Sequence, residues 1–293
     1  MERARLAFIG FGEAAQAFAK DMPAALAAYD RKTDVAATRE AKRADYARLG
    51  VAPCADNAAA IAGASLILSL VTAAQALAAA RETAAAIPAG ALFCDMNSVA
   101  PDTKRAAALA IEAAGGRYVD VAVMAPVHPA RRAVSLLVSG PHAEAGVEAL
   151  RAAGFAKVRR VEGPVGRASS IKMIRSVMVK GLEALTTECV LAADRAGVTD
   201  EVIAALNASW PGVDWAEKAD YNLERMMVHG LRRAEEMDEV VKTLDGLGTG
   251  SAMTRGTVER QRTIGRLGLG SESDLPLAAK IAAILDDQQE EAA

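Results

Sequence analysis

Aromatic residues and cysteines are scarce in this 293-residue sequence. Phe, Trp and Tyr together make up 4% of it, so the hydrophobic core has to be built mainly from Ala, Val, Leu, Ile and Met. The three cysteines, Cys54, Cys94 and Cys189, are odd in number and have no close spacing. This excludes a disulfide framework and a cysteine zinc site, and it is typical of a reducing cytoplasm, where we expect the protein to be.

Clusters of positive charge are missing as well. The net charge is −3 and no basic block occurs, which argues against binding to nucleic acid. No group of His, Cys, Asp or Glu has the spacing of metal ligands, so we predict no metal site. The first residues lead straight into a predicted strand and lack the charged-then-apolar pattern of a secretory signal.

One long stretch, Ala58 to Ala80, carries no charge. It has the length of a membrane helix. However, it is mostly alanine, and glycine or polar residues interrupt it at five positions, Gly63, Ser65, Ser69, Thr72 and Gln75. We therefore expect a helix end, a buried strand and the start of another helix here, and no membrane span.

Two kinds of pattern divide the chain near residue 165. Upstream, short apolar runs alternate with helical patterns, whereas downstream there are only helical patterns and glycine-marked loops. With 52% hydrophobic and 24% charged residues, the chain has enough core for two globular domains. We predict a first domain at residues 1–165 and a helical second domain at residues 166–293.

The stretch from Gly163 to Lys172 opens a long predicted helix, which runs from Ser169 to about Arg195. Lys172 would stand in its first turn, where the helix dipole disfavours a cation. This favours a lysine recruited for function, with a solvated lysine near a helix start as the alternative. Residues at three- and four-residue spacing predict that one apolar side of this helix is buried; they are Ile171, Ile174, Val177, Met178, Gly181, Leu182, Leu185, Cys189 and Ala192.

A dinucleotide-binding pattern follows the first predicted strand, Arg5–Gly10. It reads Gly10-Phe11-Gly12-Glu13-Ala14-Ala15 and opens a helix, which is the context that gives G-x-G-x-x-G/A its meaning. The first glycine permits a tight turn, and the second lets the backbone approach a pyrophosphate. The alanine allows close helix–strand packing, while the helix N-terminus offers free N–H groups to phosphate. We predict that these six residues bind the cofactor; a plain glycine turn is the alternative.

Cofactor preference is indicated by the end of the second predicted strand, at about residues 25–29. Asp30 follows it at the distance from the glycines that is expected of a ribose-binding acid. A carboxylate there binds the ribose hydroxyls and repels a 2′-phosphate, which favours NAD. Arg31 and Lys32 come next and would suit the phosphate of NADP, so both cofactors stay open.

The alternation of strands and helices continues to about residue 153. It predicts an α/β fold with a mainly parallel, doubly wound sheet, in which a ligand lies beyond the carboxyl ends of the strands. Val71-Thr72 and Ser98 stand at such ends, as Gly10 and Asp30 do, so we predict that they also contact the cofactor. The further strands are expected at residues 51–54, 65–71, 91–95, 118–124 and 134–138.

The order of these motifs resembles the β-hydroxyacid dehydrogenase family, which includes 3-hydroxyisobutyrate, tartronate semialdehyde and 6-phosphogluconate dehydrogenases. The resemblance implies a Rossmann-type domain, a long interdomain helix and a helical domain that builds a homodimer. It also implies that Lys172 is the general acid/base. It is carried by Gly10–Ala15, Asp95, Ser98, Pro101, Asp120, Gly163, Gly166 and Lys172.

Lysine suits this role on chemical grounds. Oxidation of an alcohol requires removal of the hydroxyl proton as hydride leaves, and the reverse reaction requires a proton donor. Partial burial lowers the pKa of a lysine toward a useful value, and its charged form stabilises a developing alkoxide.

Two departures from the family pattern affect the substrate. Ser176 stands where the family has asparagine, one turn after Lys172, and we expect it to share in catalysis or substrate positioning. The family loop whose Ser-Gly-Gly backbone binds a carboxylate reads Met124-Ala125-Pro126 here. Met124 and His128 are therefore the predicted substrate contacts, with Arg131 or Arg132 as further candidates.

The second domain offers two more candidates. In the family, a lysine that contacts the cofactor lies near the segment that starts at His229 in this chain. The pattern of this segment predicts that a helix begins or is interrupted there. Arg233 is the predicted replacement for that lysine, and His229 is a predicted substrate contact. A charged, solvated helix face is the alternative for both.

These patterns together predict an NAD(P)-dependent oxidoreductase that moves a hydride between nicotinamide and a polar hydroxy compound similar to a β-hydroxy acid. Whether decarboxylation follows stays open. An imine reductase shares the architecture but generally lacks the lysine. A dinucleotide-binding sensor or scaffold without catalysis is the alternative from another class.

Overall fold

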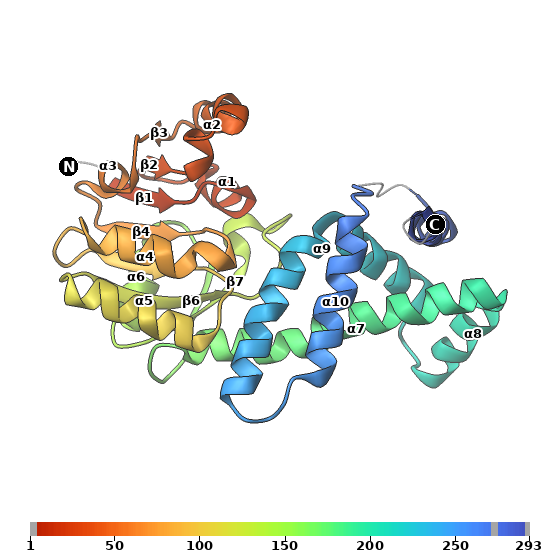
Figure 1. Cartoon of the computed structure of the whole chain (residues 1–293). Coiled ribbons are helices and arrows are strands. Elements are labelled where there is room, and N and C mark those ends of the chain that lie inside the picture. The colour runs from red at the N-terminus through yellow and green to blue at the C-terminus, as the bar shows by residue number, and fades with distance from the viewer. Residues whose placement is uncertain (1–4, 271–274, 291–293) are drawn as a thin grey trace. The chain divides into compact units, whose positions relative to one another are not determined.

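The computed structural model describes residues 5–270 and 275–290. The chain forms two compact units, residues 1–173 and 174–293, and the border between them falls inside the long helix α7 (Arg167–Ala196). Figure 1 shows the elements of each unit.

The first unit is built on one eight-stranded sheet with the order β3-β2-β1-β4-β5-β6-β7-β8. The first six strands are parallel and have the order of a dinucleotide-binding fold, whereas β7 runs antiparallel to β6. The predicted fold class is therefore confirmed. The strands are β1 (Arg5–Ile9), β2 (Ala25–Tyr29), β3 (Ala52–Pro53), β4 (Leu66–Ser69), β5 (Leu92–Asp95), β6 (Arg117–Val123), β7 (Ser135–Ser139) and β8 (Lys157–Arg160).

Helices cover both faces of this sheet, so β4 and β5 are buried throughout, as parallel strands require. One core lies under α1, α2 and α6, and a second core lies under α3, α4 and α5. The helices are α1 (Glu13–Ala19), α2 (Ala36–Leu49), α3 (Asn57–Ile61), α4 (Ala76–Ala84), α5 (Pro101–Ala113) and α6 (Ala143–Ala152); short 3₁₀ turns occupy η1 (Arg31–Thr33), η2 (Ala73–Gln75) and η3 (Arg131–Ala133).

The last strand, β8, was not predicted. Its residues Lys157–Arg160 include one buried apolar side chain, Val158, between charged residues that are exposed. An edge strand of this kind has too few apolar positions to be recognised from periodicity.

The second unit is helical, as predicted. Besides the later part of α7 it contains α8 (Thr199–Ser209), α9 (Trp215–Gly246), α10 (Ala252–Arg266) and α11 (Leu277–Glu290). Its core is formed by Val190 and Leu191 of α7, by residues of α9, and by Ile264 and Ile281.

The start of α7 differs from the prediction. The helix begins at Arg167, so Lys172 lies in its second turn and not in the first. Because the effect of the helix dipole falls off within the first turn, it is a weaker argument for a recruited lysine than the sequence suggested.

Within the single chain, the apolar side of α7 is not buried as predicted. Ile174, Met178 and Leu185 are 49%, 64% and 54% exposed. The buried side is mixed: it carries apolar residues such as Val190 and Leu191 together with the polar Lys180 and Glu183. The two polar groups are satisfied within the helical unit, because Lys180 pairs with Glu236 and Glu183 pairs with Arg233.

Helix α9 runs without a break through His229, which corrects the expectation that a helix begins or is interrupted there. The neighbouring Gly230 has a packing reason. A Cβ at Gly230 would lie 2.4 Å from the Gln261 carbonyl oxygen and 2.8 Å from Gly265 Cα. Helices α9 and α10 therefore cross with their backbones in contact.

Replacing Gly230 with alanine should force these two helices apart. We expect a loss of about 1–3 kcal/mol in the free energy of unfolding, as for other overpacked sites. Urea unfolding of G230A measures it. Gly256→Ala on α10, where a Cβ would meet nothing within 4 Å, is the control and should leave stability unchanged or slightly higher. Equal stability of the two variants would contradict the close crossing.

None of the helices in the described ranges combines the length and the hydropathy needed to cross a membrane.

Candidate active site

The strand register brings the predicted cofactor loops to one edge of the sheet. Ile9 pairs with Tyr29 of β2 and with Ser69 of β4, and Ser69 pairs with Asp95 of β5. The residues that follow these strands therefore start side by side. This row contains the glycine loop, Asp30, the segment after β4 and the loop that carries Ser98.

Gly10 and Gly12 have different environments in the glycine loop. Gly10 has φ +82°, and a Cβ there would lie 2.5 Å from the Leu70 carbonyl oxygen and 2.8 Å from Val71 Cγ1. Gly12 precedes α1 and has nothing within 4 Å of a hypothetical Cβ. The first glycine is thus needed for the fold, whereas the second leaves open space in front of a helix N-terminus.

Phe11 holds the glycine loop through both its side chain and its backbone. Its ring is fully buried against Phe8 and Tyr46, with ring centroids 5.8 and 4.9 Å away. Its N–H donates to Asp30 Oδ2 at 2.7 Å, and its carbonyl accepts from the buried Lys42 ammonium at 2.8 Å. Lys42 was not predicted; a lysine within the helical pattern gave only a weak signal.

The remaining residues of the motif begin helix α1. Glu13 is its first residue and is exposed, Ala14 is half-buried, and Ala15 is fully buried in the core, as close helix–strand packing requires. Asp30 accepts a second backbone bond, from Lys32 N at 2.9 Å. Arg31 is exposed, and its guanidinium donates to Gln75 at 2.8 Å.

Asn97 joins the ends of β4 and β5. Its side-chain oxygen accepts from Val71 N at 2.7 Å, and its amide group donates to Ser69 and to Asp95. This buried residue was not predicted, although it stands beside Ser98 at a strand end. It fixes the backbone of Val71 against the loop of Ser98, while Thr72 is exposed.

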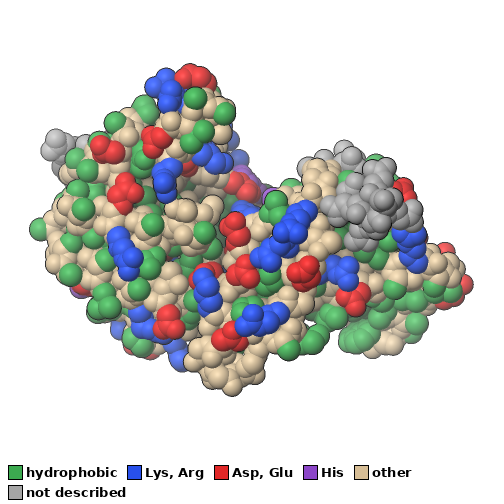
Figure 2. Space-filling view, viewed as in Figure 1, with side chains coloured by type: hydrophobic (Ala, Val, Ile, Leu, Met, Phe, Trp, Pro, Cys, Tyr) green, Lys and Arg blue, Asp and Glu red, His purple; other side chains and the backbone are tan. Residues whose placement is uncertain are grey.

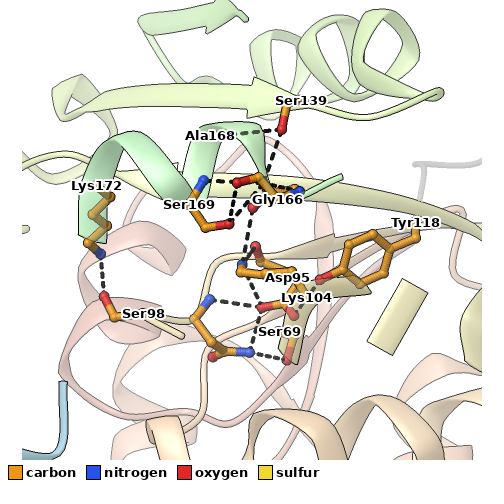
Figure 3. A network of polar contacts seen from close by, with 12 residues as sticks. Ser69, Asp95, Ser98, Lys104, Tyr118, Ser139, Gly166, Ala168, Ser169 and Lys172 are labelled. Atoms are coloured by element: carbon orange, nitrogen blue, oxygen red, sulfur yellow. Dashed lines mark hydrogen bonds and ion pairs between the residues drawn. The ribbon is translucent and has the colours of Figure 1, made fainter. Parts of the chain in front are cut away.

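Lys172 reaches this edge from α7. Its Nζ donates a hydrogen bond to Ser98 Oγ, and both residues are half-buried (Figure 3). Within the first unit the structure thus brings Lys172 to a loop that touches the segment beside Gly10. An amine in this position can exchange a proton with a hydroxyl group bound next to Ser98.

The loop after β6 carries the predicted substrate contacts Met124 and His128. Met124 packs against a small cluster of Ala122, Leu137 and Ala168, and its N–H donates to the Ser135 carbonyl in the sheet. His128 lies exposed in the loop. The Arg132 guanidinium donates to three backbone carbonyls at and after the end of α1, those of Phe18, Lys20 and Asp21, so it has a structural role.

Three predicted residues belong to the second unit. Ser176 is buried on α7, four residues after Lys172, and His229 is half-buried on α9. Arg233 is buried and forms a two-pronged pair with Glu183, with Nε 3.1 Å from Oε2. The Glu183 carboxylate thus holds this guanidinium inside the helical unit. The contact of Arg233 with a cofactor stays a prediction.

No group of three or more potential metal ligands lies together within residues 5–270 and 275–290.

Two protein-family models match the chain. Residues 5–153 match the NAD binding domain of 6-phosphogluconate dehydrogenase, and residues 193–264 match a domain of unknown function. The first match covers about half of the chain, and it includes the glycine loop and all loops of the sheet edge described above.

Solved structures extend the likeness over the whole chain. A conserved hypothetical protein from Sinorhizobium meliloti 1021 is 40% identical over 97% of both chains, with a TM-score of 0.74. A conserved protein described as structurally similar to 3-hydroxyacid dehydrogenases is 29% identical over 89% of this chain and 99% of its own, with a TM-score of 0.65. The 3-hydroxyisobutyrate dehydrogenase of Mycobacterium tuberculosis shares the fold, with 15% identity over 97% of this chain and 99% of its own, and a TM-score of 0.70.

Family match, sheet order and glycine loop agree with one another. The chain belongs to the β-hydroxyacid dehydrogenase family, with an NAD binding domain of the 6-phosphogluconate dehydrogenase kind, and it is an NAD(P)-dependent dehydrogenase acting on hydroxyl groups.

Proposed function

We propose that the enzyme transfers a hydride between nicotinamide and the carbinol carbon of a polar, β-hydroxy acid-like compound, with Lys172 as the general acid/base. The hydrogen bond from Lys172 to Ser98 carries this proposal. Of the two predicted catalytic residues, Lys172 and Ser176, the lysine is the titratable one. This hydrogen bond holds its amine at the edge of the sheet where we expect the cofactor to bind.

The proposed chemistry assigns one task to each group. Nicotinamide supplies the acceptor or donor of the hydride. In the oxidation direction, neutral Lys172 takes the hydroxyl proton of the substrate while the C–H bond breaks and a carbonyl forms. In the reduction direction, the ammonium form returns that proton to the alkoxide oxygen. Ser98 accepts a hydrogen bond from the lysine and so orients its amine.

The loop after β6 bears on the substrate. Met124 has no side-chain donor and uses its N–H in the sheet, and Pro126 has no N–H. A carboxylate held by the backbone of this loop is therefore unfavourable. We infer that the polar groups of the substrate are bound elsewhere, with His128, Ser176 and His229 as candidates.

The test begins with fluorescence titration of NADH and NADPH, followed by a screen of hydroxy acids, sugar acids and other hydroxy compounds. Turnover of a hydroxy compound supports the proposal. Reduction of imines without oxidation of any alcohol would favour the imine reductase alternative. Tight cofactor binding with no turnover of either class would favour a sensor or scaffold.

We propose NAD as the preferred cofactor. The Asp30 carboxylate is oriented by the N–H groups of Phe11 and Lys32, and its negative charge opposes a 2′-phosphate. We expect NADH to bind at least about tenfold more tightly than NADPH, a difference of about 1.4 kcal/mol. Asp30→Asn, which keeps the size of the side chain and one acceptor, should reduce this preference. A wild-type preference for NADPH would refute the assignment.

We also propose a homodimer through α7. Ile174, Met178, Leu182 and Leu185 follow one another at helical spacing and are exposed, and this face continues along the helix. Hydrophobic side chains gather along the lower edge of the helical unit in Figure 2. A second copy that contributes the same apolar stripe would bury it.

The dimer is tested by light scattering after gel filtration. We expect a dimer for the wild type and a monomer for Met178→Glu/Leu185→Glu, because four charges would enter the apolar contact. Leu109→Glu, at a residue that is 74% exposed in the first unit, is the control and should leave the dimer intact. A monomeric wild type would refute the proposal.

A further inference from the structure

A buried ionic cluster lies beside the contact between Lys172 and Ser98 in Figure 3. It consists of Asp95 at the end of β5, Asp120 in β6 and Lys104 in α5, and none of the three side chains is more than 1% exposed. Lys104 Nζ lies 3.0 Å from Asp95 Oδ1 and 3.5 Å from Asp120 Oδ1. It also donates to the Asp95 carbonyl at 2.6 Å. One lysine therefore joins two carboxylates that would otherwise repel each other in a buried site.

The Asp95 side of the cluster holds the loop that carries Ser98. Asp95 Oδ1 accepts from the backbone N–H of Asn97 at 3.0 Å and from its side-chain amide at 2.8 Å. Tyr118 donates to the other oxygen of Asp95 at 2.7 Å. Burial and the charges of Asp95 and Asp120 raise the pKa of Tyr118 well above its usual value, so its hydroxyl remains a donor.

The Asp120 side holds the start of the helix that carries Lys172. Asp120 Oδ2 accepts from Gly166 N at 3.0 Å, and from Ser169 N and Oγ at 3.2 and 3.1 Å. Ser139 donates to the same oxygen and accepts from Ala168 N at 2.9 Å. Backbone N–H groups at the start of α7, which have no acceptor within the helix, thus donate to side chains of the sheet. Figure 3 shows this helix start above the cluster, one turn before Lys172.

We propose that Asp120 and Lys104 are positioning residues, which set the place of the Lys172 amine relative to Ser98 by tying the start of α7 and the loop after β5 to one buried charge cluster. The catalytic consequence rests on the proposed role of Lys172. The positioning itself does not, because it concerns only contacts within the first unit.

The first test uses Asp120→Asn, which keeps the volume of the side chain and leaves Lys104 paired with Asp95. Lysine labelled with carbon-13 at Cε gives a resonance for Lys172, which is assigned by its loss in Lys172→Met. We expect this resonance to move in Asp120→Asn, and amide exchange at Gly166 and Ser169 to become faster. In turnover, kcat should fall about 10- to 100-fold, as for displaced reacting groups, while the KM for the cofactor stays the same.

The second test uses Lys104→Met with a matched control. Lys280 of the helical unit is also fully buried and also pairs with two carboxylates, Asp220 at 2.9 Å and Glu224 at 3.5 Å. Lys104→Met and Lys280→Met should both lower the melting temperature, and the first more strongly because its carboxylates cannot reach water. Of these two lysine variants, only Lys104→Met should move the Lys172 resonance.

Two results would overturn the inference. One is an unchanged Lys172 resonance in Asp120→Asn with unchanged amide exchange. The other is an equal change of that resonance in Lys280→Met, which would indicate general loosening of the fold. If the wild type turns over no hydroxy compound, the proposed function fails, whereas the resonance and exchange measurements still test the positioning.

Discussion

Replacing Lys172 with methionine is expected to lower kcat by about 10²- to 10⁴-fold, the usual contribution of a positioned acid/base group. Methionine keeps the length of the side chain and removes the amine that donates to Ser98. Binding of the cofactor should be retained, because the glycine loop and the Asn97 contact with Val71 do not include Lys172. Steady-state kinetics and NADH titration of the same preparation measure both quantities.

A second substitution separates proton transfer from charge. Lys172→Arg keeps a positive charge, but a guanidinium does not give up its proton at accessible pH. We expect it to be nearly as inactive as Lys172→Met. Lys157→Met, at an exposed lysine of β8, is the control and should have wild-type activity. Full turnover by Lys172→Met would remove this lysine from the mechanism.

Alanine should destabilise the fold at Gly10 and leave its stability nearly unchanged at Gly12. At Gly10 the backbone has φ +82°, and the new Cβ would lie 2.5 Å from the carbonyl oxygen of Leu70. The left-handed backbone and the clash together should lower the free energy of unfolding by about 2–5 kcal/mol. Denaturant unfolding measures this loss, which is large compared with the stability of a typical domain.

Gly12→Ala is predicted to fold normally and to lose cofactor affinity. Its Cβ meets no atom of the protein within 4 Å, and its φ of −81° suits any residue. The methyl group would instead fill space in front of the α1 N-terminus, where we expect the pyrophosphate to lie. We expect stability within about 1 kcal/mol of the wild type and at least about tenfold weaker NADH binding. Unchanged NADH affinity would place the cofactor elsewhere.

Local sequence patterns were sufficient to predict the sheet of the first unit except for its edge strand β8. The glycine loop, Asp30 and Ser98 were predicted from where apolar runs end, and the strand register does place the ends of these runs in one row. The prediction works because a buried parallel strand needs a continuous apolar run and its turn needs particular residues. Both are properties of neighbouring positions in the chain.

Contacts between residues that are far apart in the sequence could not be predicted from local patterns. Asn97, Lys42 and Lys104 look like ordinary loop or helix residues. Lys104 precedes Ala107, Ala108 and Ile111 at the spacing of a buried helix face, which is the one signal that it needs a buried partner. Its partners, however, come from β5 and β6.

The long helix α7 shows the same limit most clearly. Its spacing of apolar residues by itself established that it is a helix with one apolar side. The tertiary structure decided that this side is exposed in the single chain while Lys180 and Glu183 are buried. It also decided that Lys172 meets Ser98, 74 positions away. Periodicity records which side chains share a face, but which face is covered depends on the charges and surfaces that folding brings from elsewhere in the chain.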